Sequence, residues 1–206
     1  MFTGLIRETA TVKRYAGNVL SLRADYRPTV GDSVAVNGVC LTVVRLHSDG
    51  FDVELADETR AVIDEGRLQG RVHIEPAMQM GDRFEGHIVQ GHVDTLGTVA
   101  RITSGENGTD FYITVPEEYL RFIVPKGSIT IDGVSLTVNA VDDRGFHLMI
   151  IPHTLQNTLI GTYRIGTHVN VETDMFARYI DHLLAHRTAQ KKGLSWDEID
   201  AIALGY

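Results

Sequence analysis

Hydrophobic and polar residues alternate in two short stretches of the chain that have almost the same sequence. Residues 33–42 read Ser-Val-Ala-Val-Asn-Gly-Val-Cys-Leu-Thr, and residues 128–137 read Ser-Ile-Thr-Ile-Asp-Gly-Val-Ser-Leu-Thr. Alternation with a period of two is typical of a strand that is buried on one face. The central Asn-Gly and Asp-Gly pairs tolerate the positive φ angles of a type I′ turn, so each stretch is predicted to form a two-residue β-hairpin.

The two-residue turn fixes which side chains share a face of each hairpin. In the second copy, the apolar face consists of Ile129, Ile131, Val134 and Leu136, and the polar face consists of Ser128, Thr130, Ser135 and Thr137. The polar face of the first copy consists of Ser33, Ala35, Cys40 and Thr42. Such a face could bind a flat polar heterocycle through hydrogen bonds. The alternative is a set of cross-strand pairs that only stabilise a solvated sheet face.

The repeat extends well beyond the hairpins, which indicates a duplicated module. The matched blocks are residues 4–14 with 91–101, residues 33–42 with 128–137, Phe51 and residues 58–59 with Phe146 and residues 153–154, and residues 72–75 with 169–172. Their constant order predicts two modules of about 90 residues that join near residues 85–87. Short β-branched runs between turn residues predict a sandwich or a small barrel for each module.

Helical spacing of apolar residues begins only after the second module. A brief helical turn is predicted at residues 116–122, and an amphipathic helix is predicted from Asp174 to about Arg187. The apolar stripe of this helix could mediate self-association, and packing against its own barrels is the ordinary alternative. The capping box at residues 195–198 predicts the start of a second short helix.

Composition narrows the class of protein further. The net charge of −8 and the scarcity of Lys/Arg clusters argue against a nucleic-acid partner. No stretch approaches the roughly 20 apolar residues that a membrane span needs. The first residues lack the features of a secretory signal, and the single cysteine, Cys40, cannot form an internal disulfide, so we expect a cytoplasmic protein.

Histidines are the main candidates for metal or acid–base chemistry. His87 and His92 would point to opposite faces of a strand, and His182 and His186 share a helix face but lack a third ligand, so no metal site is predicted. His92 differs from its repeat counterpart, Leu5. A titratable group at one of two matched positions suits an asymmetric acid–base role, and a buried, hydrogen-bonded histidine is the alternative.

Together these segments resemble the riboflavin synthases of the homotrimeric, duplicated-barrel type. The resemblance lies in residues 1–6, 37–43, 91–94, 126–127, 132–138 and 151–155. It implies a mainly β fold of two six-stranded antiparallel Greek-key barrels, over residues 1–86 and 87–174, and a helical segment over residues 175–206. It also implies that this segment gathers three subunits. Whether the trimer associates with lumazine synthase is left open by the resemblance.

The resemblance further implies an activity. In this family, one molecule of 6,7-dimethyl-8-ribityllumazine transfers a four-carbon unit to a second, which gives riboflavin and 5-amino-6-(D-ribitylamino)uracil without any cofactor. The reaction begins with removal of a proton from the 7-methyl group and addition of a nucleophile to C7 of the partner. Two copies of one binding module suit two copies of one substrate, because proximity then supplies much of the catalysis.

The resemblance assigns site residues to both modules. One ligand is expected to contact Ser135, Leu136, Thr137, Met149, Ile150, Ile151, Pro152, His153, Thr154 and, from a neighbouring subunit, Gly4, Leu5 and Ile6. The other is expected to contact Cys40, Leu41, Thr42, Glu54, Leu55, Ala56, Asp57, Glu58, Thr59, Lys126 and, from a neighbour, Gly91, His92 and Val93. The expected catalytic residues are His92, Ser135, Cys40, Thr137 and Asp174, and Asp174 has helix capping as its alternative role.

Two alternative functions remain. A non-catalytic lumazine- or flavin-binding antenna protein would use the same repeated barrels, but such relatives tend to lose polar residues in one module, whereas both modules keep them here. A structural or protein-interaction barrel would leave the polar faces unexplained. The chain departs from the family pattern at Glu85 and Gln90, and Glu85 could alter a loop over the site.

Overall fold

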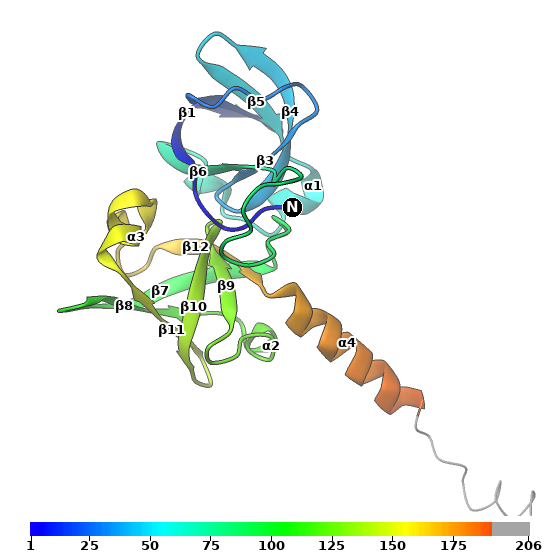
Figure 1. Cartoon of the computed structure of the whole chain (residues 1–206), viewed down its shortest axis with the longest axis vertical. Helices are drawn as coiled ribbons and strands as arrows, with labels where there is room; N and C mark the ends of the chain where they lie inside the picture. The colour runs from blue at the N-terminus through cyan, green and yellow to red at the C-terminus, as the bar shows by residue number, and fades with distance from the viewer. Residues whose placement is uncertain (191–206) are drawn as a thin grey trace, which may run out of the picture.

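The computed structural model describes residues 1–190 and consists of two closed, six-stranded antiparallel β-barrels followed by a helix (Figure 1). The N-terminal barrel contains β1 (Glu8–Ala16), β2 (Val19–Arg23), β3 (Ser33–Val36), β4 (Val39–His47), β5 (Gly50–Glu54) and β6 (Arg71–Pro76). The C-terminal barrel contains β7 (Thr95–Gly105), β8 (Gly108–Thr114), β9 (Ser128–Ile131), β10 (Val134–Val141), β11 (Gly145–Ile150) and β12 (His168–Thr173). The strands close in the same order in both barrels, which confirms the predicted duplicated β fold.

Short helical segments fill the connections between strands. They are α1 (Asp57–Arg60), the 3₁₀ turn η1 (Glu65–Arg67), α2 (Glu117–Leu120), α3 (Pro152–Asn157) and the 3₁₀ turn η2 (Leu159–Thr162). The helical turn predicted for residues 116–122 is confirmed as α2.

Both hairpins have the predicted turn and register. Ala35 pairs with Cys40 across β3 and β4, and Thr130 pairs with Ser135 across β9 and β10. The turn residues Asn37 and Asp132 have φ angles of 45° and 46°, and the glycine that follows each also has a positive φ, as a type I′ turn requires.

Each barrel has its own apolar core, formed by the inward side chains of its strands. The N-terminal core contains Leu20, Leu22, Phe51 and Ile74, and the C-terminal core contains Ile113, Ile129, Phe146 and Leu148, all almost fully buried. Alternation therefore turns the predicted apolar face of each hairpin into its barrel and leaves the polar face outside.

The two barrels meet at the tips of the two hairpins. A Cβ atom on Gly38 would lie 2.6 Å from the backbone nitrogen of Gly133, so only glycine allows this approach. The side-chain amide of Asn170 on β12 donates to the carbonyl oxygen of Asn37 at 2.9 Å. The two turns thus contact each other at an approximate two-fold axis between the barrels.

A buried carboxylate anchors this contact. Asp132 is fully buried, and its Oδ2 accepts hydrogen bonds from Arg67 at 2.6 Å and from the hydroxyl of Tyr163, while Oδ1 accepts the backbone N–H of Asn170 at 2.8 Å. Because Arg67 belongs to the N-terminal module, its ion pair with Asp132 joins the two halves of the chain. The imidazole of His73 adds a second link, at 2.9 Å from the carbonyl oxygen of Asp132 and 2.6 Å from the backbone nitrogen of Leu159.

The last described element, α4 (Met175–Gln190), leads away from the barrels (Figure 1). The amphipathic helix predicted from Asp174 to Arg187 is confirmed and extends to Gln190. More than half of the surface of several apolar side chains on α4 is exposed, among them Phe176, Tyr179, Ile180 and Leu183. Among the described helices, none has the length and apolar character to cross a membrane. The helix predicted from Ser195 lies outside the described residues.

Candidate active site

Two segments cross between the barrels and cover part of the polar face of each hairpin. We call residues 2–6 the N-strap and residues 87–93 the linker strap. The N-strap precedes β1 but lies on the C-terminal barrel, where Gly4 accepts the backbone N–H of Ser135 at 2.8 Å. The linker strap precedes β7 but lies on the N-terminal barrel, where Gly91 accepts the backbone N–H of Cys40, also at 2.8 Å. Each half of the chain therefore covers the hairpin of the other half.

The strap glycines are required for this close approach. Gly4 and Gly91 have the same φ of 78°, a conformation that side chains rarely adopt. A Cβ atom would lie 2.5 Å from Cβ of Ser135 in the first case and 2.7 Å from Cβ of Cys40 in the second. The two straps also pair with each other through Phe2 and Val89.

A pocket of about 430 Å³ opens beside the linker strap on the N-terminal barrel. We call it the N-barrel pocket, and its lining consists of Val39, Cys40, Glu58, Thr59, Val62, Gly91, His92 and Val93. The pocket combines a thiol, a carboxylate, a hydroxyl and an imidazole with apolar walls, which is the mixture expected of a small-molecule site.

The polar face of the other hairpin carries a histidine–serine pair. Nδ1 of His87 lies 2.7 Å from Oγ of Ser135, and Nε2 lies 3.2 Å from Oγ1 of Thr130. Burial lowers the pKa of His87, while the charge of Asp174 opposes this effect. The neutral imidazole with its proton on Nε2 can donate to Thr130 and accept the proton of Ser135. The pair can therefore pass a proton between the hydroxyl of Ser135 and the imidazole of His87.

The two polar faces differ chemically. Cys40 is the counterpart of Ser135, but its cross-strand partner is Ala35, which offers no hydroxyl to a histidine. His92 lines the N-barrel pocket, whereas His87 contacts the hairpin of the C-terminal barrel. Two equivalent modules thus present different acid–base groups.

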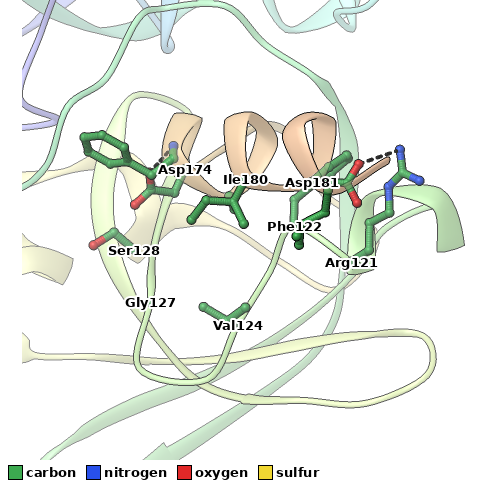
Figure 2. A pocket seen from close by; sticks show the side chains of 11 residues that line it. Arg121, Phe122, Val124, Gly127, Ser128, Asp174, Ile180 and Asp181 are labelled. Carbon is green, nitrogen blue, oxygen red and sulfur yellow. Dashed lines mark hydrogen bonds and ion pairs between the residues drawn. The ribbon is translucent and has the colours of Figure 1, made fainter. Parts of the chain in front are cut away.

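A second cavity, of about 400 Å³, lies between α4 and the loop before β9. Figure 2 shows Asp174 at one end of it and the ion pair between Arg121 and Asp181, 3.4 Å apart, at the other, with apolar side chains such as Val124 and Ile180 between them. Oδ1 of Asp174 accepts the backbone N–H of Phe176 at 2.9 Å, so this carboxylate caps α4.

Comparison with known proteins identifies the family. The sequence profile of the lumazine binding domain matches residues 3–77 and again residues 90–174. The riboflavin synthase of Actinobacillus pleuropneumoniae is 40% identical over 208 residues, which cover 96% of this chain and 97% of that protein. The riboflavin synthase of Bacillus subtilis is 35% identical, with 93% of each chain covered.

The chain belongs to the riboflavin synthase family. Among solved structures, LumP complexed with riboflavin has the same fold, with a TM-score of 0.75 at 24% sequence identity over 84% of this chain and 99% of LumP. LumP complexed with 6,7-dimethyl-8-(1′-D-ribityl)lumazine aligns with a TM-score of 0.74 at the same identity. The predicted family is therefore confirmed.

In this member of the riboflavin synthase family, the structure brings together many of the predicted N-terminal site residues. Cys40, Glu58, Thr59 and the linker-strap residues 91–93 line one pocket. Thr42, Glu54, Ala56 and Asp57 are exposed nearby on β4, β5 and α1. Leu41 and Leu55 point into the barrel core, so only their backbone is available to a ligand.

The predicted residues of the C-terminal module lie around β10 and β11. Ser135 and Leu136 are half-buried, and Thr137 is exposed beside them. Met149, Ile151, Pro152 and His153 are exposed, Thr154 is half-buried, and Ile150 belongs to the core. Lys126 is exposed in the loop before β9, where its backbone N–H donates to Val138 at 2.7 Å.

Within one chain, Gly4 lies against Ser135 and Gly91 lies against Cys40, because the straps cross between the barrels. The predicted contact of each ligand with strap residues of a neighbouring subunit stays a prediction. The polar face of β9 and β10 carries the four predicted hydroxyl groups, but Thr130 is buried, and its hydroxyl lies 3.2 Å from Nε2 of His87.

Sequence reasoning missed the contact between His87 and Ser135. It treated His87 and His92 as residues on opposite faces of a strand, whereas only one isolated bridge, Phe2 with Val89, forms in this segment. The described residues contain no group of three His, Cys, Asp or Glu side chains placed to hold a metal ion. The rings of His182 and His186 lie 4.2 Å apart on α4.

A buried carboxylate gives the fold a testable pH dependence. Burial raises the pKa of Glu172 from 4.5 to about 7, although the N–H groups of Gln90 and Gly91 and the charge of Arg178 favour ionisation. The folded chain therefore keeps a proton that the unfolded chain loses between these two values, so rising pH lowers the free energy of unfolding through this interval. The contribution of Glu172 should be about 2–3 kcal/mol.

Urea unfolding of the natural chain and of Glu172→Gln, at about pH 5 and about pH 8, measures the contribution of Glu172 to the free energy of unfolding. The natural chain should lose about 2–3 kcal/mol more than the neutral variant between the two conditions. An equal loss in both chains would show that Glu172 does not titrate in this interval.

Proposed function

We propose that this chain catalyses the dismutation of two 6,7-dimethyl-8-ribityllumazine molecules to riboflavin and 5-amino-6-(D-ribitylamino)uracil, without a cofactor. The observation that carries the proposal is the pair of equivalent hairpin faces, each with small polar side chains and each covered by a crossing strap. Two equivalent modules can hold two copies of one substrate in a fixed relation, and this proximity lowers the entropic barrier to their reaction.

The chemically unequal polar groups support different roles for the two substrate molecules. In this proposal, Oγ of Ser135 takes a proton from the acidic 7-methyl group of one lumazine while its own proton passes to Nδ1 of His87, 2.7 Å away. Cys40 and His92 line the other pocket, where a polar contact or a nucleophile can act on C7 of the second lumazine. Thr137 contributes a further hydroxyl. The negative charge of Asp174, at the start of α4, raises the pKa of His87 and so favours the protonated imidazole.

The proposal includes a homotrimer whose productive sites form between the N-terminal barrel of one subunit and the C-terminal barrel of the next. The exposed apolar side chains of Phe176, Tyr179, Ile180 and Leu183 on α4 support self-association through this helix. The proposed units are residues 1–86, 87–174 and 175–206, with Lys126 near the shared site. Association with lumazine synthase and a cytoplasmic location remain predictions.

The alternative function is a non-catalytic, lumazine- or flavin-binding antenna protein. LumP, which was solved in complex with riboflavin, shares this fold, so the fold alone is compatible with binding without turnover. The histidine–serine pair favours catalysis, because pure binding requires no proton acceptor beside the hydroxyl.

Absorbance and fluorescence of the purified chain with 6,7-dimethyl-8-ribityllumazine, in buffer with a chelator and no added cofactor, should show steady formation of riboflavin. Heat-denatured protein at the same concentration is the control for spontaneous reaction. Binding with a spectral shift but no turnover would instead support the antenna protein, and absence of binding would contradict both functions.

A further inference from the structure

Two buried glutamates occupy equivalent positions at the bases of the two straps. Glu75 on β6 and Glu172 on β12 stand at matched positions of the repeat, and their exposed fractions are 4% and 3%. Neither side chain points into the N-barrel pocket, and sequence reasoning assigned neither of them a role.

Both carboxylates accept backbone N–H groups from a strap. Glu172 accepts from Gln90 at 2.7 Å, from Gly91 at 2.9 Å and from His92 at 3.1 Å. Glu75 accepts from the backbone N–H of Thr3 at 2.8 Å and of Gly4 at 3.0 Å, and from the hydroxyl of Thr3 at 2.9 Å. In each case the bonds include the glycine whose carbonyl oxygen binds the hairpin on the other barrel.

We propose that Glu172 and Glu75 are positioning residues, and that each, carried by one barrel, holds the strap that covers the polar hairpin face of the other barrel. Glu172 fixes the linker strap over Cys40, and Glu75 fixes the N-strap over Ser135. The consequence for catalysis rests on the proposed function, whereas the strap geometry itself can be tested without turnover.

The charged groups around Glu172 tie the linker strap to α4 as well. Asp94 and Arg178 face it, and they form an ion pair with an N–O distance of 2.6 Å, while Arg178 also donates to the side-chain oxygen of Gln90 at 2.6 Å. Thr173, the residue after Glu172, donates to Asp94 through its backbone N–H at 2.7 Å. Several side chains thus hold the linker strap, and Glu172 is the one that accepts the backbone N–H of Gly91.

The arrangement predicts crossed effects. Loss of Glu172, a residue of the C-terminal barrel, should disturb the Cys40 face of the N-terminal barrel. Loss of Glu75 should disturb the Ser135 face of the C-terminal barrel. If each carboxylate stabilised only its own barrel, its loss would not affect the hairpin face of the other barrel.

Cys40 is the only cysteine in the chain and therefore reports directly on the linker strap. In the full-length native protein, Glu172→Ala should raise the rate of Cys40 modification by a thiol reagent about tenfold, the factor that corresponds to losing about 1.4 kcal/mol of strap closure. Glu75→Ala and the exposed-site control Glu106→Ala should leave the rate within about twofold of the natural chain.

The reciprocal experiment moves the thiol to the other face. In the double variant Cys40→Ser with Ser135→Cys, adding Glu75→Ala should raise the modification rate about tenfold, whereas adding Glu172→Ala should not. Circular dichroism checks that each variant is folded.

Two conservative variants keep the test decisive if Glu172→Ala does not fold. Glu172→Gln keeps an acceptor oxygen at the same reach and should retain most of the protection of Cys40. Glu172→Asp keeps the carboxyl group but withdraws both oxygens by one methylene group, so it should expose the thiol more than Glu172→Gln does. Equal rates in the natural chain and Glu172→Asp, or equal acceleration by Glu75→Ala and Glu172→Ala, would overturn the proposal, while absence of turnover in the natural chain would overturn only the proposed function.

Discussion

Replacing Ser135 by alanine should slow riboflavin formation by about a hundredfold or more, because it removes the hydroxyl through which His87 exchanges a proton with the ligand. His87→Gln should have an effect of similar size, since the buried neutral imidazole is the proton acceptor of this pair. The double variant should be hardly slower than the slower single variant, because the two groups act as one unit. Steady-state kcat of the three variants measures this coupling.

The control is Ser104→Ala, which removes an exposed serine hydroxyl on β7 and should leave kcat unchanged. Circular dichroism should show native folds in every variant. If the effects of Ser135→Ala and His87→Gln simply multiply in the double variant, the two groups act independently, and the proposed proton relay is wrong.

Replacing Asp132 by asparagine should lower the free energy of unfolding by about 2–4 kcal/mol, because it leaves the guanidinium of Arg67 without its buried partner. Asparagine tolerates the positive φ of this turn position as well as aspartate does, and Asn37 occupies the equivalent position of the first hairpin. The substitution therefore isolates the carboxylate from the turn. Urea unfolding at neutral pH, with the slope compared between variants, measures the loss.

The exposed ion pair between Lys13 and Asp49 provides the matched control. Asp49→Asn should leave the unfolding midpoint almost unchanged, because solvent already screens this pair. A midpoint for Asp132→Asn equal to that of Asp49→Asn would show that the ion pair between the two modules does not contribute to stability.

The hairpins could be predicted from sequence because their determinants are local. The Asn-Gly and Asp-Gly pairs fix the turn, the turn fixes the register, and alternation then assigns every side chain of residues 33–42 and 128–137 to a face. The internal repeat then predicted that the second module has the same fold as the first. The amphipathic spacing of residues 174–187 likewise predicted α4, although the exposure of its apolar side chains depends on three-dimensional packing.

The straps could not be predicted from local pattern. The contacts of Gly4 with Ser135 and of Gly91 with Cys40 join segments that are far apart in the chain, and neither strap has the periodicity of a strand. For the same reason, no local pattern indicated that His87 reaches Ser135. One signal was available in the repeat, because Glu75 and Glu172 end the matched blocks at residues 72–75 and 169–172. A carboxylate that is buried there needs hydrogen-bond donors.

The central claim, that two molecules of one substrate react with each other on this chain, can be tested by isotope labelling. The substrate is an equimolar mixture of unlabelled 6,7-dimethyl-8-ribityllumazine and the same compound carrying ¹³C at C6, C7 and both methyl carbons. If one lumazine donates its four-carbon unit to another, riboflavin should contain no, one or two labelled four-carbon units in a ratio of one to two to one. Mass spectrometry distinguishes the three species, because each labelled unit adds four mass units. Riboflavin without any doubly labelled species would contradict the account, because the added carbons would then come from another source.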